Sequence, residues 1–296
     1  MKHYLHAPTL ERNPKVSITQ DEFGAIRMAR QALNAAFTLE EIYDLVLGNY
    51  RELEVAILAA AVEETTRWKD GYGDHFAARS EFNRRTLNLL SAARLYLDQH
   101  QSLLKRLGAN PEEAERQRRA VYDASFEYRF MEALRNHAQH AGRAVHGVGT
   151  STTWLPPERR ELLEYRTTPY AMKASLSSDP KFKRSVLAEC PEKIPIAPAA
   201  RAYVGGLSAV HQQVRLLASS HIEGSRGTIE RAIEKHRKRA KRRFIGLTAI
   251  AEELDGSIEE VPVFLEWDDV RVRLARKNRP VTNLRQRYAT GRPHDA

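Results

Sequence analysis

Apolar residues recur every three or four positions along residues 19–107, and this is the period of an amphipathic helix. The same stretch contains no proline. Thr38 and Glu41 fit the T-x-x-E capping box, so we predict a helix that begins there and runs to about Arg67. Its buried stripe would be Ile42, Leu45, Val46, Leu53, Ile57 and Ala60.

Two further helical patterns follow. Gly71 and Gly73 indicate a turn, after which a third helix carries its own apolar stripe. Asn110 and Pro111 are typical of the start of a fourth helix, which Gly142 would end. Four long helices with one apolar stripe each predict a mainly α fold built as an antiparallel helical bundle.

The pattern changes after the fourth helix. Seven prolines interrupt residues 150–198, which we interpret as a Pro-rich insertion containing a short strand at 163–168 and a short helix at 181–189. A last long helix begins near Pro198, with Gly224 and Gly227 as candidate break points. Beyond it the pattern predicts a hairpin and a helix. The sequence thus predicts an N-terminal arm (1–18), a helical domain (19–243) and a small, basic C-terminal α+β or hairpin extension (244–296).

Composition limits the compartments and the partners that we expect for this protein. The one cysteine, Cys190, excludes an internal disulfide and is typical of a reducing compartment. No apolar run approaches the roughly 20 residues of a membrane span, and the N-terminus lacks a secretion signal. We therefore expect a soluble, cytoplasmic protein with no membrane partner. The formal net charge of +9 favours a polyanionic partner, whether DNA, RNA or an acidic protein.

The run Arg135-Asn136-His137-Ala138-Gln139-His140 near the end of the fourth helix combines a permanent cation, an amide and a titratable imidazole. Such groups can hold a phosphate and move a proton beside it. An Arg followed by a His after four to six residues also occurs by chance at Arg94/His100, Arg215/His221, Arg231/His236 and Arg287/His294. Of these five arginines, only Arg135 is followed by a polar residue, and only its helix is rich in aromatic residues. Since Asn136 and His140 share a helix face while Arg135 lies about 100° away, the three groups converge only partly within one chain.

Arg135, Asn136 and His140 resemble the signature of the HEPN superfamily, a group of helical-bundle proteins that includes many metal-independent ribonucleases. The resemblance covers residues 20–225 and leaves the arm and the tail unexplained. It implies RNA cleavage in which the ribose 2′-hydroxyl attacks the adjacent phosphate, with Arg135 stabilising the phosphate charge and His140 acting as general base or acid. It also implies a homodimer whose two motif helices meet at the site, and a role as a toxin or phage-defence effector with an antitoxin or defence partner protein.

Other interpretations remain open. Arg135 would pair with Glu132 on a solvated helix face if the run had no function, and the protein would then be a non-catalytic nucleic-acid-binding or protein-assembly module. His137 follows Leu134 by three residues and is expected in the core. The spacing of His137, His140 and His146 does not match a familiar zinc pattern, so we predict neither a metal nor another cofactor.

A basic run near the end of the last helix is a candidate nucleic-acid-binding segment. It holds seven cations in nine positions: Lys235, Arg237, Lys238, Arg239, Lys241, Arg242 and Arg243. Contact with phosphate and a merely solvated helix end explain it about equally well. The tail after Val270 adds further arginines, beginning with Arg271.

Overall fold

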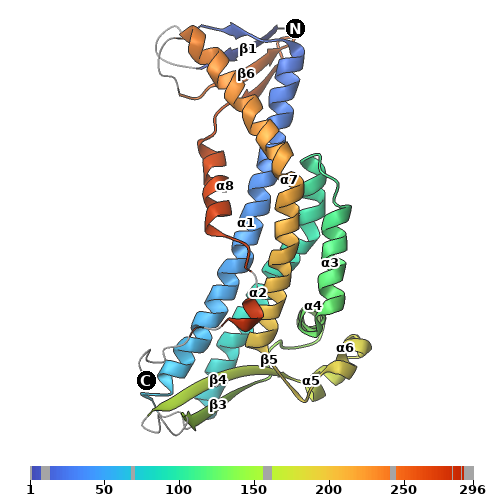
Figure 1. Ribbon diagram of the computed structural model, residues 1–296, viewed down its shortest axis with the longest axis vertical. Coiled ribbons are helices and arrows are strands. Elements are labelled where there is room, and N and C mark those ends of the chain that lie inside the picture. The colour runs from blue at the N-terminus through green and yellow to red at the C-terminus, as the bar shows by residue number, and fades with distance from the viewer. Residues whose placement is uncertain are drawn as a thin grey trace. The chain divides into compact units, whose positions relative to one another are not determined.

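The computed structural model describes residues 2–7, 14–67, 71–155, 162–240, 245–281, 283–287 and 289. This part of the chain is mainly helical, with eight α-helices and two small antiparallel sheets (Figure 1). None of the described helices combines the length and apolar character needed to cross a bilayer. The chain forms two compact units of three segments each. The first unit comprises Met1–Ile42, Gln99–Ala114 and Gln213–Arg279, and the second comprises Tyr43–Asp98, Glu115–Gln212 and Pro280–Ala296.

Helix α1 (Gln20–Glu63) is one uninterrupted helix, so the predicted helix start at Thr38 is wrong. The capping box lies instead at Thr19, whose backbone N–H donates to Glu22 Oε2 (2.7 Å) while Thr19 Oγ1 accepts from the Glu22 N–H (3.1 Å). Both positions fit T-x-x-E, but the apolar period continues through Thr38. There the hydroxyl donates to the Asn34 carbonyl one turn back (3.1 Å).

The first unit contains a four-stranded antiparallel sheet with the strand order β2-β1-β6-β7. Its strands are β1 (Lys2–His6), β2 (Val16–Ser17), β6 (Thr248–Glu252) and β7 (Ile258–Pro262). Strands β1 and β6 are labelled in Figure 1. The prediction of a hairpin near residue 250 is confirmed. Residues 1–18, however, are not an arm, because β1 pairs with β6 along its whole length, and residues 244–296 are not a separate extension.

One face of this sheet packs on the beginning of α1 and the end of α7 (Ile196–Ala240). The core includes Leu5 from β1, Phe23 and Leu33 from α1, Ile229 from α7, and Ala249 from β6. Helix α7 does not break at either glycine that the sequence offered as an interruption. Each glycine weakens a helix by about 1 kcal/mol. Burial of the last turns of α7 against the sheet offsets this cost.

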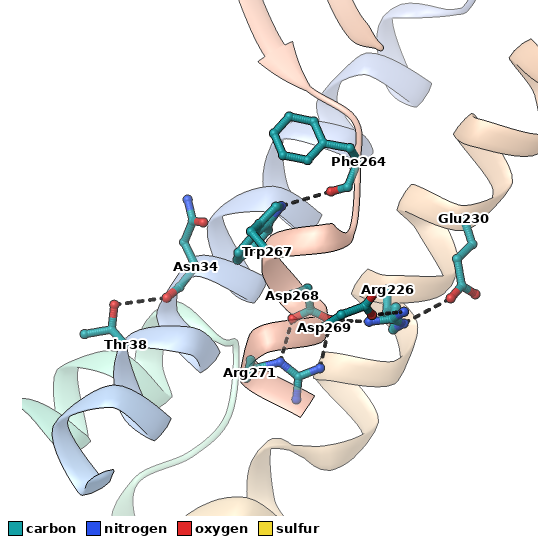
Figure 2. A network of polar contacts seen from close by, with 9 residues as sticks. All are labelled: Asn34, Thr38, Arg226, Glu230, Phe264, Trp267, Asp268, Asp269 and Arg271. Atoms are coloured by element: carbon teal, nitrogen blue, oxygen red, sulfur yellow. Dashed lines mark hydrogen bonds and ion pairs between the residues drawn. The ribbon is translucent and has the colours of Figure 1, made fainter. Parts of the chain in front are cut away.

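Helix α8 (Glu266–Lys277) is held to α7 by an ionic network around the buried Asp268 (Figure 2). Asp268 is fully buried, and it accepts hydrogen bonds from Arg226 of α7 (2.6 Å) and from Arg271 on its own helix (2.6 and 2.9 Å). Arg226 also binds Asp269 (2.8 Å). Arg271, which the sequence grouped with the basic tail, is therefore an internal counter-ion.

The predicted fourth helix is two helices, α3 (Glu112–Ala124) and α4 (Phe126–His140), which from Glu115 onward belong to the second unit. The start at Asn110 is confirmed, since its Oδ1 accepts the Glu112 N–H at 3.0 Å. The break lies at Ser125, whose backbone is extended and whose Oγ accepts the Tyr128 N–H at 3.1 Å. The third predicted helix is confirmed as α2 (Tyr72–Arg106).

The Pro-rich segment forms a three-stranded antiparallel sheet with the strand order β3-β4-β5. Its elements are β3 (Gly147–Trp154), β4 (Leu163–Met172), α5 (Lys173–Ser177), α6 (Arg184–Glu189) and β5 (Lys193–Pro195). The predicted strand and short helix are confirmed as β4 and α6. Strand β3 was not predicted, because it is mostly solvent-exposed and carries no alternation of apolar residues.

Helices of the second unit meet through aromatic side chains. Tyr43 stacks on His211 with ring centroids 3.8 Å apart, and the Tyr128 and Tyr203 rings lie 4.8 Å apart. Gly206 explains how α7 comes so close to α3 and α4, because a Cβ there would lie 2.8 Å from the Tyr128 ring. The 3₁₀ turn Leu284–Gln286 follows α8.

Candidate functional site

Burial of one face of α4 determines which of its side chains reach solvent. The buried residues are Tyr128, Phe130, Met131, Ala133, Leu134 and His137. Arg135 is consequently half-buried, while Asn136, Gln139 and His140 are exposed. The helix therefore presents the candidate catalytic residues on its outer side.

The guanidinium of Arg135 is held by two side chains of its own helix. Its Nη1 donates to Gln139 Oε1 at 2.9 Å, and its Nη2 donates to Asn136 Oδ1. Arg135 and Asn136 therefore contact each other, although helical spacing alone placed Arg135 about 100° from the face that Asn136 and His140 share. Glu132, the alternative partner, accepts a hydrogen bond from the Tyr203 hydroxyl instead.

Arg135 and Asn136 both line a cavity of about 280 Å³. Five of the lining side chains are cationic and one is a carboxylate. The lining residues are Arg94, Tyr122, Arg129, Glu132, Ala133, Arg135, Asn136, Lys181 and Lys183. We call this cavity the α4 pocket.

Two of the five cations already have carboxylate partners. Arg94 binds Asp98 (2.6 Å), and Arg129 binds Glu189 (2.7 Å). Within the described part of the chain, Arg135, Lys181 and Lys183 have no carboxylate partner. Lys183 Nζ donates to the Tyr122 hydroxyl at 2.6 Å. The α4 pocket therefore carries unneutralised positive charge and favours an anion.

A buried imidazole–carboxylate pair joins the two sides of the α4 pocket. His137 Nδ1 lies 2.8 Å from Asp179 Oδ2, and both side chains are at most 5% exposed. Asp179 Oδ1 also accepts the backbone N–H of Lys181 at 2.9 Å. The hydrogen bond from His137, followed by the one from Lys181, lowers the pKa of Asp179 below its ordinary value. His137 is thus a core residue, as expected, and it fixes the turn that carries Lys181 and Lys183.

His140 occupies a different position from the other two motif residues. It is exposed at the last turn of α4 and is not among the residues that line the α4 pocket. It follows Asn136 by one helical turn on the same face, a rise of about 6 Å. The structure therefore brings Arg135 and Asn136 together and leaves the imidazole outside the pocket lining.

The histidines near α4 do not converge as metal ligands. His137 Nδ1 is occupied by Asp179, and His146 Nδ1 accepts the Met172 N–H at 3.2 Å. Over the described ranges, no group of three or more His, Cys, Asp or Glu side chains is placed to hold a metal ion. Cys190 is buried and donates to the Val186 carbonyl, and burial raises the pKa of its thiol to about 11.

The basic run at the end of α7 is partly neutralised. Lys235 binds Glu22 (2.6 Å) and Arg237 binds Glu234 (2.6 Å), while Lys238 and Arg239 are exposed. The remaining members of the run, Lys241, Arg242 and Arg243, lie outside the described residues.

No family model, no curated protein and no solved structure matches this chain.

Proposed function

We propose that this chain is a metal-independent endoribonuclease of HEPN type, which binds RNA phosphate in the α4 pocket. One observation carries the proposal: Arg135 and Asn136 lie in a cavity with four other cationic side chains and a single carboxylate. Arginine suits this position because its planar fork of N–H donors fits phosphate oxygens. Phosphate binding would replace the hydrogen bonds that Arg135 now makes to neighbouring amides.

In the proposed reaction, the ribose 2′-hydroxyl attacks the adjacent phosphorus while the bond from phosphorus to the 5′-oxygen breaks. A base takes the proton of the 2′-hydroxyl, and an acid gives a proton to the leaving 5′-oxygen. The products are a 2′,3′-cyclic phosphate and a 5′-hydroxyl. Arg135 stabilises the charge that develops on phosphate, and Asn136 orients it. His140 transfers one of the two protons, since an imidazole nitrogen can accept or donate a proton.

A second copy of the chain completes the site in this proposal. His140 does not line the α4 pocket, so within one chain the candidate acid or base lies outside the phosphate site. A twofold mate that places its α4 against this one would bring a second imidazole to the same phosphate. We therefore propose a homodimer. The resemblance of the α4 motif to the HEPN signature further implies a toxin or phage-defence effector that a partner protein restrains.

The test is incubation of the purified protein with tRNA and mRNA in EDTA, followed by analysis of the product ends. We expect cyclic-phosphate ends, and a loss of rate of about 10²- to 10⁴-fold in His140→Ala, the range for one general acid or base. Arg135→Ala should also lose cleavage. His75→Ala and Arg106→Ala, which change exposed residues of α2 outside the α4 pocket, are matched controls that should keep it.

Cleavage that EDTA abolishes, or that persists in both Arg135→Ala and His140→Ala, would refute the proposal. RNA binding without cleavage by any preparation would favour a non-catalytic nucleic-acid-binding or assembly protein. Circular dichroism of each variant checks that a lost activity does not reflect a lost fold.

A further inference from the structure

A second and larger cavity, of about 700 Å³, lies in the first unit where β2 meets the last turns of α7. Five of its lining side chains are cationic and one is a carboxylate. The lining residues are Pro14, Lys15, Val16, Ser17, Arg231, Glu234, Lys235, Lys238 and Arg239. We call this cavity the α7 groove.

Much of the positive charge in the α7 groove is not neutralised. Lys235 is paired with Glu22, as described above. Lys15 instead lies over the Tyr4 ring (4.3 Å), and Arg231 donates to the Thr228 hydroxyl. In the described portion of the chain, Lys238 and Arg239 have no carboxylate partner. The groove thus keeps cations available to an outside anion.

The cations follow one face of α7. Residues 231, 235, 238 and 239 are spaced by four, three and one, which places them along a single helix face over about 12 Å. A strand of duplex DNA rises about 3.4 Å per phosphate, so this length corresponds to three or four phosphates. The repeat of charge therefore suits a linear polyanion better than a single small anion.

We propose that the α7 groove binds the sugar-phosphate backbone of a nucleic acid. The groove is concave, so its shape suits a narrow chain better than the flat surface of a membrane. Among the described residues that line the groove, none is an aromatic side chain on which bases could stack, so we expect contacts to phosphate to dominate binding. The proposal does not depend on cleavage, because the groove and the α4 pocket belong to different units.

The test measures binding of the full-length chain to a fluorescent single-stranded 2′-O-methyl RNA by anisotropy. That RNA lacks the attacking hydroxyl, so cleavage chemistry does not enter the result. The variant Lys238→Gln/Arg239→Gln removes two of the five cations of the groove. Its matched control, Lys105→Gln/Arg106→Gln, neutralises one exposed lysine and one exposed arginine that are also adjacent and in the same unit.

Each phosphate contact to a single strand contributes about 0.7 to the slope of log K against log salt. The groove variant should therefore reduce that slope by about 1.4 and weaken binding about 25-fold at 0.1 M salt. The control should change neither. Retention of full binding by His140→Ala would support the groove whether or not the chain cleaves RNA.

Equal slopes for the groove variant and its control would overturn the proposal. Loss of binding to poly-glutamate with RNA binding unchanged would overturn it too, and would identify an acidic protein as the partner. Loss of binding to anionic vesicles alone would do the same in favour of a membrane surface.

Discussion

His146 keeps its imidazole neutral at the edge of the β3–β4 sheet. Burial lowers its pKa to about 4, with smaller contributions from His137, Arg143 and Arg79. Its Nδ1 accepts the Met172 backbone N–H at 3.2 Å, and that bond requires an unprotonated nitrogen. The residue is therefore bound in its uncharged form in the folded state.

The lowered pKa of His146 makes the free energy of unfolding depend on pH. The folded pKa of about 4 lies below the ordinary 6.5, so between these values the unfolded chain binds more protons. Stability contributed by neutral His146 is present above pH 6.5 and is lost as pH falls toward 4. In urea titrations at pH 7 and pH 4.5, His146→Gln should show a smaller acid-induced loss than the natural chain. The same loss in both proteins would contradict the assignment.

The residues of the α4 pocket differ in how far the sequence reveals them. Arg135 and Asn136 stand in a recognisable run, and the position of His137 on the apolar stripe predicts its burial. Asp179 and Lys183 carry no such signal. They reach α4 only through a tertiary contact across 42 or more residues, and local patterns contain no information about such contacts.

Among the helices, the break at Ser125 is the clearest departure from expectation. Aromatic residues continue at four-residue intervals on both sides of it, so the periodicity indicates a single helix. Ser125 ends that continuity by taking an extended backbone and capping α4. At Thr38, in contrast, a capping pattern is present without a helix start: T-x-x-E occurs at both Thr19 and Thr38 but caps a helix only at Thr19.

Ser125→Ala should destabilise the protein by about 1 kcal/mol, because the N–H of Tyr128 loses its acceptor at the first turn of α4. Ser102→Ala is the matched control, since Ser102 lies within α2 and donates only to the Gln99 carbonyl. Urea unfolding of both variants measures the difference. Equal stability of the two would show that Ser125 does not act as a cap.

For the whole chain, the sequence correctly indicates a mainly helical, basic protein but gives the wrong division into parts. Each unit takes three separate segments, and the N-terminal strand pairs with a strand about 245 residues later. Pairing over such a distance depends on complementary short strands, and five residues of β1 are too few for a periodic signal.

A chain that ends at residue 243 should therefore lose the fold of its first unit, although the sequence suggested that only an extension would be removed. Without β6 and β7, strand β1 keeps only β2 and the core loses Ala249 and Val261. Hydrogen exchange should show unprotected amides in β1 and the first turns of α1. A chain that ends at Arg279 retains every segment of the first unit and is the control. Full protection of β1 in the shorter chain would contradict this organisation.

The bond between His137 and Asp179 has a consequence for any ligand of the α4 pocket. Two segments separated in sequence supply the donors of the pocket, and this buried bond helps to hold the turn that bears Lys181 and Lys183 beside the helix. The groups that would bind phosphate are thus preorganised before phosphate enters the pocket. Binding of phosphate therefore costs less conformational entropy, and a larger part of the free energy of each contact contributes to affinity.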